Sequence, residues 1–99
     1  MSLNVSKKLN GTTLEVALDG SLDTLTAPQL EEELGSFDGV TELIFDYENL
    51  TYISSAGLRV MVGCFKNMED KGEMKIIHAS DVVKEIFEVT GLSDTLNIE

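Results

Sequence analysis

The sequence predicts an α/β domain, in which an N-terminal β-hairpin precedes alternating helices and strands that form a mixed, mostly parallel sheet. Three observations predict this fold. An Asn-Gly dipeptide separates two strand-like segments, short apolar runs recur along the chain, and segments with helical 3.6-residue spacing lie between those runs. Such alternation is typical of parallel sheets, because each crossover lays a helix against the sheet. The 99 residues suffice for one domain, 1–99.

The hairpin is predicted from residues 3–9 and 12–19, which flank Asn10 and Gly11. These residue types are favoured in two-residue hairpin turns because both tolerate a positive φ. Every second residue of the latter segment is apolar, which predicts one buried face formed by Leu14, Val16 and Leu18.

The first helix is expected to begin near Thr26, which has the T-x-x-Q spacing of a capping box with Gln29, while Pro28 is tolerated in a first turn. The three glutamates at 31–33 are expected early in this helix, where the macrodipole favours anions. Its buried side would consist of Ala27, Leu30 and Leu34.

A short apolar run at 43–45 predicts a central strand covered on both faces. The second helix is expected to follow Ser54 and Ser55 and to end near Lys71, with Gly72 as its C-cap. The apolar residues of this segment have helical spacing: Leu58, Met61, Val62, Phe65 and Met68.

A further strand is predicted at 74–78, and Ser80 or Asp81 is expected to cap a third helix that ends at Gly91. Residues 96–98 predict a last short strand. The apolar residues of the third helix are Val83, Ile86 and Phe87.

The formal net charge is −11, from 18 acidic and 7 basic residues. Nucleic-acid binders need a cationic face, so we expect no nucleic-acid partner and no anionic membrane surface. A basic protein partner is compatible with this charge, as is a role in solubility alone. No apolar run approaches the ~20 residues of a membrane span. The N-terminal residues lack the apolar core of a signal peptide, so we expect a cytoplasmic protein.

The sequence offers no recognisable catalytic constellation. Cys64 is the single cysteine and falls in a helical pattern, which favours a buried thiol over a nucleophile. His78 is the single histidine, so no zinc cluster is expected. The glycine-rich phosphate-binding motifs and G-x-S-x-G are absent. We therefore expect no enzymatic activity, no metal and no cofactor.

Ser54 and Ser55 lie where an apolar strand passes into the second helix, so their hydroxyls are expected at a helix N-terminus. Free N–H groups and the macrodipole favour a capping oxygen there, and they also favour a phosphate. N-capping, worth about 1 kcal/mol, accounts for one hydroxyl only. A phosphate on Ser55 would add nearly two negative charges, which Arg59 could partly screen from one turn later. The residues alone leave both interpretations open.

Asp23 lies between a glycine turn and the first helix, where an aspartate commonly stabilises a turn. Loops that leave the carboxyl ends of parallel strands share one edge of the sheet. Asp23 and the serine turn are therefore expected to lie close together, and one partner could cover both.

These segments resemble the bacterial anti-sigma-factor antagonists, single-domain members of the STAS family, and the resemblance covers nearly the whole chain. Residues 20–27, GSLDTLTA, are similar to the family's G-x-L-D-x-x-T-A. Residues 50–58, LTYISSAGL, are similar to its L-x-[YF]-[IM]-D-S-[ST/A]-G-L, and residues 90–92, TGL, provide a third mark. Each motif alone is weak, but three in the right order are specific.

The resemblance implies a partner switch in transcription. An unmodified antagonist binds an anti-sigma factor that is also a serine kinase, and so frees a sigma factor. Phosphorylation at the position of Ser55 releases the antagonist, and a PP2C-type phosphatase restores it. The partner-binding residues that the resemblance implies are Asp23, Thr24, Thr26, Ser54, Ser55, Ala56, Gly57, Leu58 and Arg59.

Two residues depart from the family pattern. Ser54 stands where the motif has an aspartate, and Arg59 stands where a small residue is usual, so both move the local charge in the positive direction. The chain also ends soon after its last predicted strand, so we expect the family's C-terminal helix to be shortened or missing. The alternatives are an unphosphorylated STAS scaffold subunit of a transport or signalling complex and a nucleotide-binding enzyme.

Overall fold

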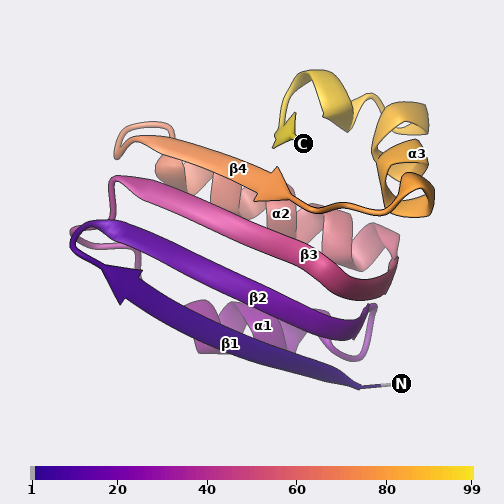
Figure 1. Ribbon diagram of the computed structural model, residues 1–99, viewed down its shortest axis with the longest axis horizontal. Coiled ribbons are helices and arrows are strands. Elements are labelled where there is room, and N and C mark those ends of the chain that lie inside the picture. Colours follow the sequence, from indigo (N-terminus) through magenta and orange to yellow (C-terminus); the bar gives the residue numbers. More distant parts are fainter. Residues whose placement is uncertain (1) are drawn as a thin grey trace.

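The computed structural model describes residues 2–99 and contains a five-stranded sheet with three α-helices (Figure 1). The strands lie side by side in the order β1-β2-β3-β4-β5, so that β3 is central. The elements are β1 (Leu3–Asn10), β2 (Thr13–Leu22), α1 (Ala27–Leu34), β3 (Glu42–Ile53), α2 (Ser55–Met68), β4 (Glu73–Ile77), α3 (Asp81–Val89), the 3-10 helix η1 (Leu92–Asp94) and β5 (Asn97–Ile98).

The predicted hairpin and the mixed, mostly parallel sheet are confirmed. β1 and β2 pair antiparallel, with Asn10 opposite Thr13 and Gly11 at a φ of 59° in the turn between them. β2, β3, β4 and β5 pair in parallel. The carboxyl ends of β2 and β3 therefore lie at the same edge of the sheet, on the right in Figure 1.

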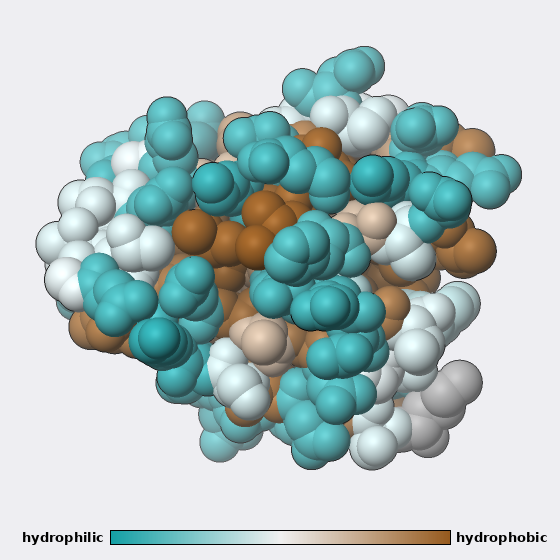
Figure 2. Space-filling view, viewed as in Figure 1, coloured by the Kyte–Doolittle hydropathy of each residue, from teal (hydrophilic) through white to brown (hydrophobic). Residues whose placement is uncertain are grey.

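Helices cover one face of the sheet: in Figure 1, α1 and α2 lie behind the strands. Along β3, Leu43 and Phe45 are buried, whereas Ile44 and Asp46 are half-buried. The prediction that residues 43–45 are covered on both faces was therefore wrong, because this burial alternates as in a sheet packed on one side. Figure 2 shows the uncovered face, where hydrophobic residues near the centre are surrounded by hydrophilic ones.

α1 begins after Thr26 and buries Ala27, Leu30 and Leu34, as predicted, but its charge pattern and its capping differ from the prediction. It has no acidic residue in its first turn, since it ends at Leu34 and the glutamates at 31–33 lie in its second half. The predicted capping box was also wrong: Thr26 makes no side-chain cap hydrogen bond, and Gln29 Nε2 donates to the carbonyl oxygen of Leu3 at 3.0 Å. The Gln29 side chain, which the capping box would need, is thus hydrogen-bonded to β1 instead.

α2 has the predicted position but ends earlier. Its last residue is Met68, and the N–H of Gly72 donates to the Met68 carbonyl oxygen at 2.9 Å in the turn that follows, so Gly72 is not the C-cap. The buried side includes Val60 and Cys64, which lie outside the predicted stripe, whereas Val62 is half-buried. The helix is therefore rotated slightly from the orientation that its apolar spacing indicated.

Of the two predicted capping residues of α3, Ser80 and Asp81, the structure selects Ser80. The N–H of Val83 donates to Ser80 Oγ at 3.2 Å. Val83 and Phe87 are buried against the sheet, and Ile86 is half-buried. Gly91, at a φ of 76°, ends this segment, and the unpredicted η1 connects it to β5.

Candidate partner-binding site

The loops that follow β2 and β3 meet at one edge of the sheet. Leu22 and Ile53, the last residues of these strands, are paired, and the N–H of Ser54 donates to the Leu22 carbonyl oxygen at 2.9 Å. Asp23 directly follows Leu22, and Ser55 directly follows Ser54. The expectation that these loops share one edge is therefore confirmed.

Gly57 allows the start of α2 to approach the two strand ends closely. A Cβ atom at this position would lie 2.8 Å from Leu22 Cγ and 2.8 Å from Ile53 Cγ1, closer than packed carbon atoms approach. Glycine is thus needed here for packing, and the first turn of α2 is held firmly against β2 and β3.

The two serines have different environments. Ser54 has an extended backbone and is the N-cap of α2, with its Oγ accepting a hydrogen bond from the N–H of Gly57 at 3.4 Å. Ser55 is the first residue of the helix and is exposed. Within residues 2–99, no hydrogen bond holds the Ser55 hydroxyl. Capping is therefore assigned to Ser54, and the Ser55 hydroxyl is free to react or to contact a partner.

Asp23 and Thr26 bond each other reciprocally. The N–H of Thr26 donates to Asp23 Oδ1 at 3.1 Å, and the N–H of Asp23 donates to Thr26 Oγ1 at 2.9 Å. Leu25 N–H also donates to Asp23 Oδ1 at 2.9 Å, and the Thr26 hydroxyl donates to the Ser21 carbonyl oxygen at 2.8 Å. This is the pattern of a capping box, located three residues before the predicted one. These hydrogen bonds therefore fix the conformation of the loop that contains Asp23.

The same hydrogen bonds set the charge and the exposure of this loop. Partial burial raises the pKa of Asp23, but the hydrogen bonds from Thr26 and Leu25 outweigh it and lower the pKa below its ordinary value. Thr26 is buried and positions its neighbours, whereas Thr24 is exposed and the side chain of Leu25 is 80% exposed. A fixed carboxylate thus lies beside an exposed apolar side chain.

Arg59 connects the Asp23 loop to the outer side of α2. It lines a hollow of about 280 Å³ together with Thr24 and Ala56. On the other side of the helix, Arg59 and Ser55 line a groove of about 490 Å³. The loop and the first two turns of α2 therefore form one continuous surface.

The structure gathers all nine implied partner-binding residues at this edge, with different degrees of exposure. The exposed group is Thr24, Ser55 and Arg59. The half-buried group is Asp23, Ser54 and Ala56. The buried group is Thr26, Gly57 and Leu58. The exposed and half-buried groups offer most of the side-chain surface to a partner, and of the buried group Leu58 contributes a small exposed part that lines the groove. Sequence reasoning missed Leu25, although an apolar residue between two threonines is a recognisable signal, and it missed the groove residues Val62, Gly63, Lys66 and Leu92.

Other polar groups lie away from this surface. Asp46, Glu48 and His78 have ligand atoms within 4.8 Å of one another, as a metal site requires, but His78 Nδ1 lies 3.0 Å from Asp46 Oδ1, and this pairing explains the cluster without a metal. Burial, aided by the nearby Glu31, raises the pKa of the Cys64 thiol to about 12, which makes it a poor nucleophile.

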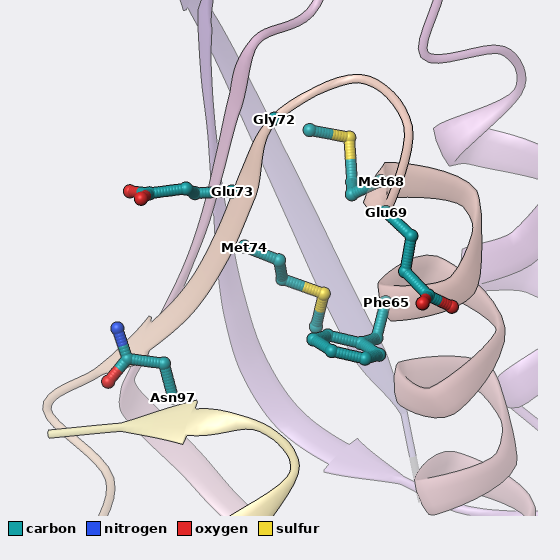
Figure 3. A pocket seen from close by; sticks show the side chains of 7 residues that line it. All are labelled: Phe65, Met68, Glu69, Gly72, Glu73, Met74 and Asn97. Atoms are coloured by element: carbon teal, nitrogen blue, oxygen red, sulfur yellow. The ribbon is translucent and has the colours of Figure 1, made fainter.

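A separate hollow of about 350 Å³ lies where α2 ends (Figure 3). The side chains of Met74 and Phe65 point toward one another there, whereas the carboxylate of Glu73 points away from them. This hollow is at the opposite end of the helix from Ser55, so it does not belong to the candidate site.

Comparison with known sequences gives consistent matches. The family model of the STAS domain matches residues 4–99. The anti-sigma-B factor antagonist of Staphylococcus aureus (strain NCTC 8325 / PS 47) is 37% identical over 102 residues, covering 99% of this chain and 94% of the relative. The anti-sigma-B factor antagonist of Bacillus subtilis (strain 168) is 32% identical over 100 residues, covering 99% of this chain and 92% of the relative.

Solved structures share the fold at lower sequence identity. An anti-sigma factor antagonist from Mycobacterium paratuberculosis has a TM-score of 0.89 at 20% identity, covering 98% of this chain and 85% of that protein. SpoIIAA of Bacillus in its phosphorylated form has a TM-score of 0.74 at 22% identity, covering 99% of this chain and 91% of that protein. Among the described residues, no helix combines the length and the apolar character needed to cross a membrane.

Proposed function

This chain belongs to the STAS domain family, and we propose that it acts as an anti-sigma factor antagonist whose binding is switched by phosphorylation of Ser55. In this role the unmodified protein captures an anti-sigma factor that is also a serine kinase, and a sigma factor is released. The chain itself performs no catalysis: it is the substrate of the kinase and of a PP2C-type phosphatase. Its partners are proteins, not nucleic acid or membrane.

The observation that carries the proposal is the division of roles between the two serines. Because Ser54 supplies the cap, the Ser55 hydroxyl can be modified while the hydrogen bond to Gly57 persists. The first N–H groups of a helix lack intrahelical partners, and they favour an anion. A phosphate on Ser55 is therefore compatible with the fold.

The same phosphate would oppose binding. Ser55 is exposed at the edge where Thr24, Leu25 and Arg59 are also exposed, so a partner that covers this surface covers the modified side chain. Phosphorylation adds nearly two negative charges at neutral pH. Burying an unpaired charge costs several kcal/mol, which is enough to dissociate a complex of ordinary affinity.

The test is phosphorylation by the anti-sigma kinase of the same organism with ATP. We expect one added phosphate by intact-mass spectrometry, located on Ser55 by fragmentation. Ser54→Ala is the matched control and should still be modified, whereas Ser55→Ala should not. Equal modification of Ser55→Ala would contradict the site, and a wild-type protein that neither binds nor is modified by the kinase would favour the scaffold alternative.

Binding gives a second readout. Ser55→Asp should weaken the complex with the kinase while the far-ultraviolet circular dichroism and the urea midpoint stay as in the wild type, because the cap is on Ser54. A Ser55→Asp variant that loses its fold would show instead that Ser55 has a structural role.

A further inference from the structure

The groove beside α2 is mostly apolar and has Ser55 in its lining. Its volume is about 490 Å³, and it lies between α2 and η1, with Leu58, Val62 and Leu92 as its apolar residues. Val62 and Leu92 are half-buried, so their exposed parts remain open to another molecule. The groove suits one apolar side chain, or a few, from an amphipathic segment.

The polar lining of this groove is positive in an otherwise acidic protein. Arg59 and Lys66 line it, and α2 contains no acidic residue, whereas the whole chain has a net charge of −11. Neither cation forms an ion pair in the part of the chain that the structure describes. Glu31 lines the hollow on the other side of Arg59, and Glu69 follows Lys66 by three residues, but no carboxylate lines the groove itself. A segment docked in the groove therefore meets the two cations directly, while more remote charges are screened over roughly 8–10 Å at physiological salt.

Gly63 leaves an open position on the exposed side of this helix. Glycine is, after proline, the residue least favourable in a helix interior. A Cβ atom at Gly63 would meet no other atom within 4 Å, so nothing in the described structure requires glycine there, in contrast to Gly57. Gly63 lines the groove, where the missing side chain leaves room for the backbone of a partner.

We infer that the partner docks on α2 through an acidic amphipathic segment, with apolar side chains in the groove and carboxylates beside Arg59 and Lys66. The inference deepens the proposed function, on which it rests for the identity of the docking surface. It departs from the expectation of a basic partner that the overall charge allows, because the local charge of the docking surface has the opposite sign. Acidic side chains there would gain charge-assisted hydrogen bonds to the two free cations.

The arrangement also specifies how phosphorylation would act. Ser55 and Arg59 are one helical turn apart, so a phosphate on Ser55 lies close enough to compete for the Arg59 guanidinium. The partner's carboxylates would then lose a cation and face a like charge in the same groove. Repulsion of this kind should weaken an acidic segment far more than a neutral one.

Two labelled helical peptides with the same apolar spacing test the inference directly. One carries glutamates and the other lysines on the polar face, and binding is followed by fluorescence anisotropy. We expect the acidic peptide to bind at least about tenfold more tightly, with affinity falling as sodium chloride is raised. Equal binding of the two peptides, or preference for the basic one, would overturn the inference.

Charge reversal on the protein supplies the matched control. In the double variant Arg59→Glu, Lys66→Glu, the preference should invert toward the basic peptide. The variant Lys8→Glu, Lys84→Glu has the same change of net charge away from the groove and should keep the wild-type preference. If both double variants respond alike, total charge rather than the groove determines binding, and the inference fails.

Experiments with the anti-sigma kinase separate this inference from the proposed function. The Arg59→Glu, Lys66→Glu variant should bind the kinase at least about tenfold more weakly. Gly63→Ala should also bind it more weakly while remaining folded. If wild type is phosphorylated on Ser55 and both variants bind as wild type does, the proposed function stands and the acidic docking segment is wrong.

Discussion

The N–H of Ser54 donates to the carbonyl oxygen of Leu22 at 2.9 Å, which ties the residue before α2 to the last residue of β2. The loop that contains Asp23 begins at the next residue after Leu22. The two functional segments are therefore parts of one hydrogen-bonded edge rather than two separate loops.

Ser54→Ala should lower the free energy of unfolding by about 1 kcal/mol, because it removes the side-chain oxygen that accepts from the N–H of Gly57. The urea midpoint is the measurement. Ser55→Ala is the control and should leave the midpoint nearly unchanged. The reverse order of the two effects would contradict the assignment of the cap.

Gly57→Ala and Gly63→Ala should change stability in opposite directions. The added methyl group at Gly57 meets Leu22 and Ile53 at 2.8 Å, and overpacking of this kind costs roughly 1–3 kcal/mol. At Gly63 the methyl group meets open space and the helix gains roughly 0.5–1 kcal/mol from the better residue. Thermal and urea unfolding of the two variants check this contrast, and a destabilised Gly63→Ala would refute it.

Tyr47→Phe should stabilise the protein by about 1 kcal/mol. The Tyr47 side chain is fully buried between Phe45 and Phe87, and its hydroxyl has no hydrogen-bond partner among the described residues. A buried unsatisfied hydroxyl costs roughly 1–3 kcal/mol, and phenylalanine keeps the ring without it. Tyr52→Phe, at an exposed position, should have little effect on the same urea midpoint. A clearly destabilised Tyr47→Phe would mean that the hydroxyl has a partner.

Asp23→Asn should be less stable than the wild type at neutral pH, and this difference in stability should disappear in acid. The pKa of Asp23 is lowered in the folded protein, so the folded state favours the carboxylate. That stability is present above the unfolded pKa of about 3.9 and is lost as pH falls through the folded pKa. Urea midpoints of both proteins across this range are the measurement. Asp38→Asn, at an exposed aspartate, is the matched control for the loss of one negative charge.

Local patterns were sufficient for most of the fold. Asn10 and Gly11 identified the hairpin, and Ser80 identified the start of α3, because these signals depend on neighbours within a few residues. The capping box at Thr26 and Gln29 failed for the opposite reason. The Gln29 side chain bonds to β1, a contact between residues 26 positions apart that no local pattern contains.

The location of the site was predictable, but the separate roles of Ser54 and Ser55 were not. Parallel strands bring the two loops to one edge, which is a matter of topology. Whether Ser54 or Ser55 caps the helix depends on backbone angles at a single residue, and the sequence pattern fits both. The groove needs Leu92, from an element that was not predicted, so it could not be recognised before the fold was known.

Placing the cap on Ser54 and the reactive hydroxyl on Ser55 has a consequence for how long each form of the protein persists. Proteases act mainly on chains that have transiently opened, at a rate set by the population of the open state. Since modification of Ser55 leaves the cap of α2 in place and adds an anion that a helix N-terminus favours, the modified form would open no more often than the unmodified form and would be degraded no faster. Degradation would then not selectively remove the modified protein, so the return to the unmodified form would depend on the phosphatase.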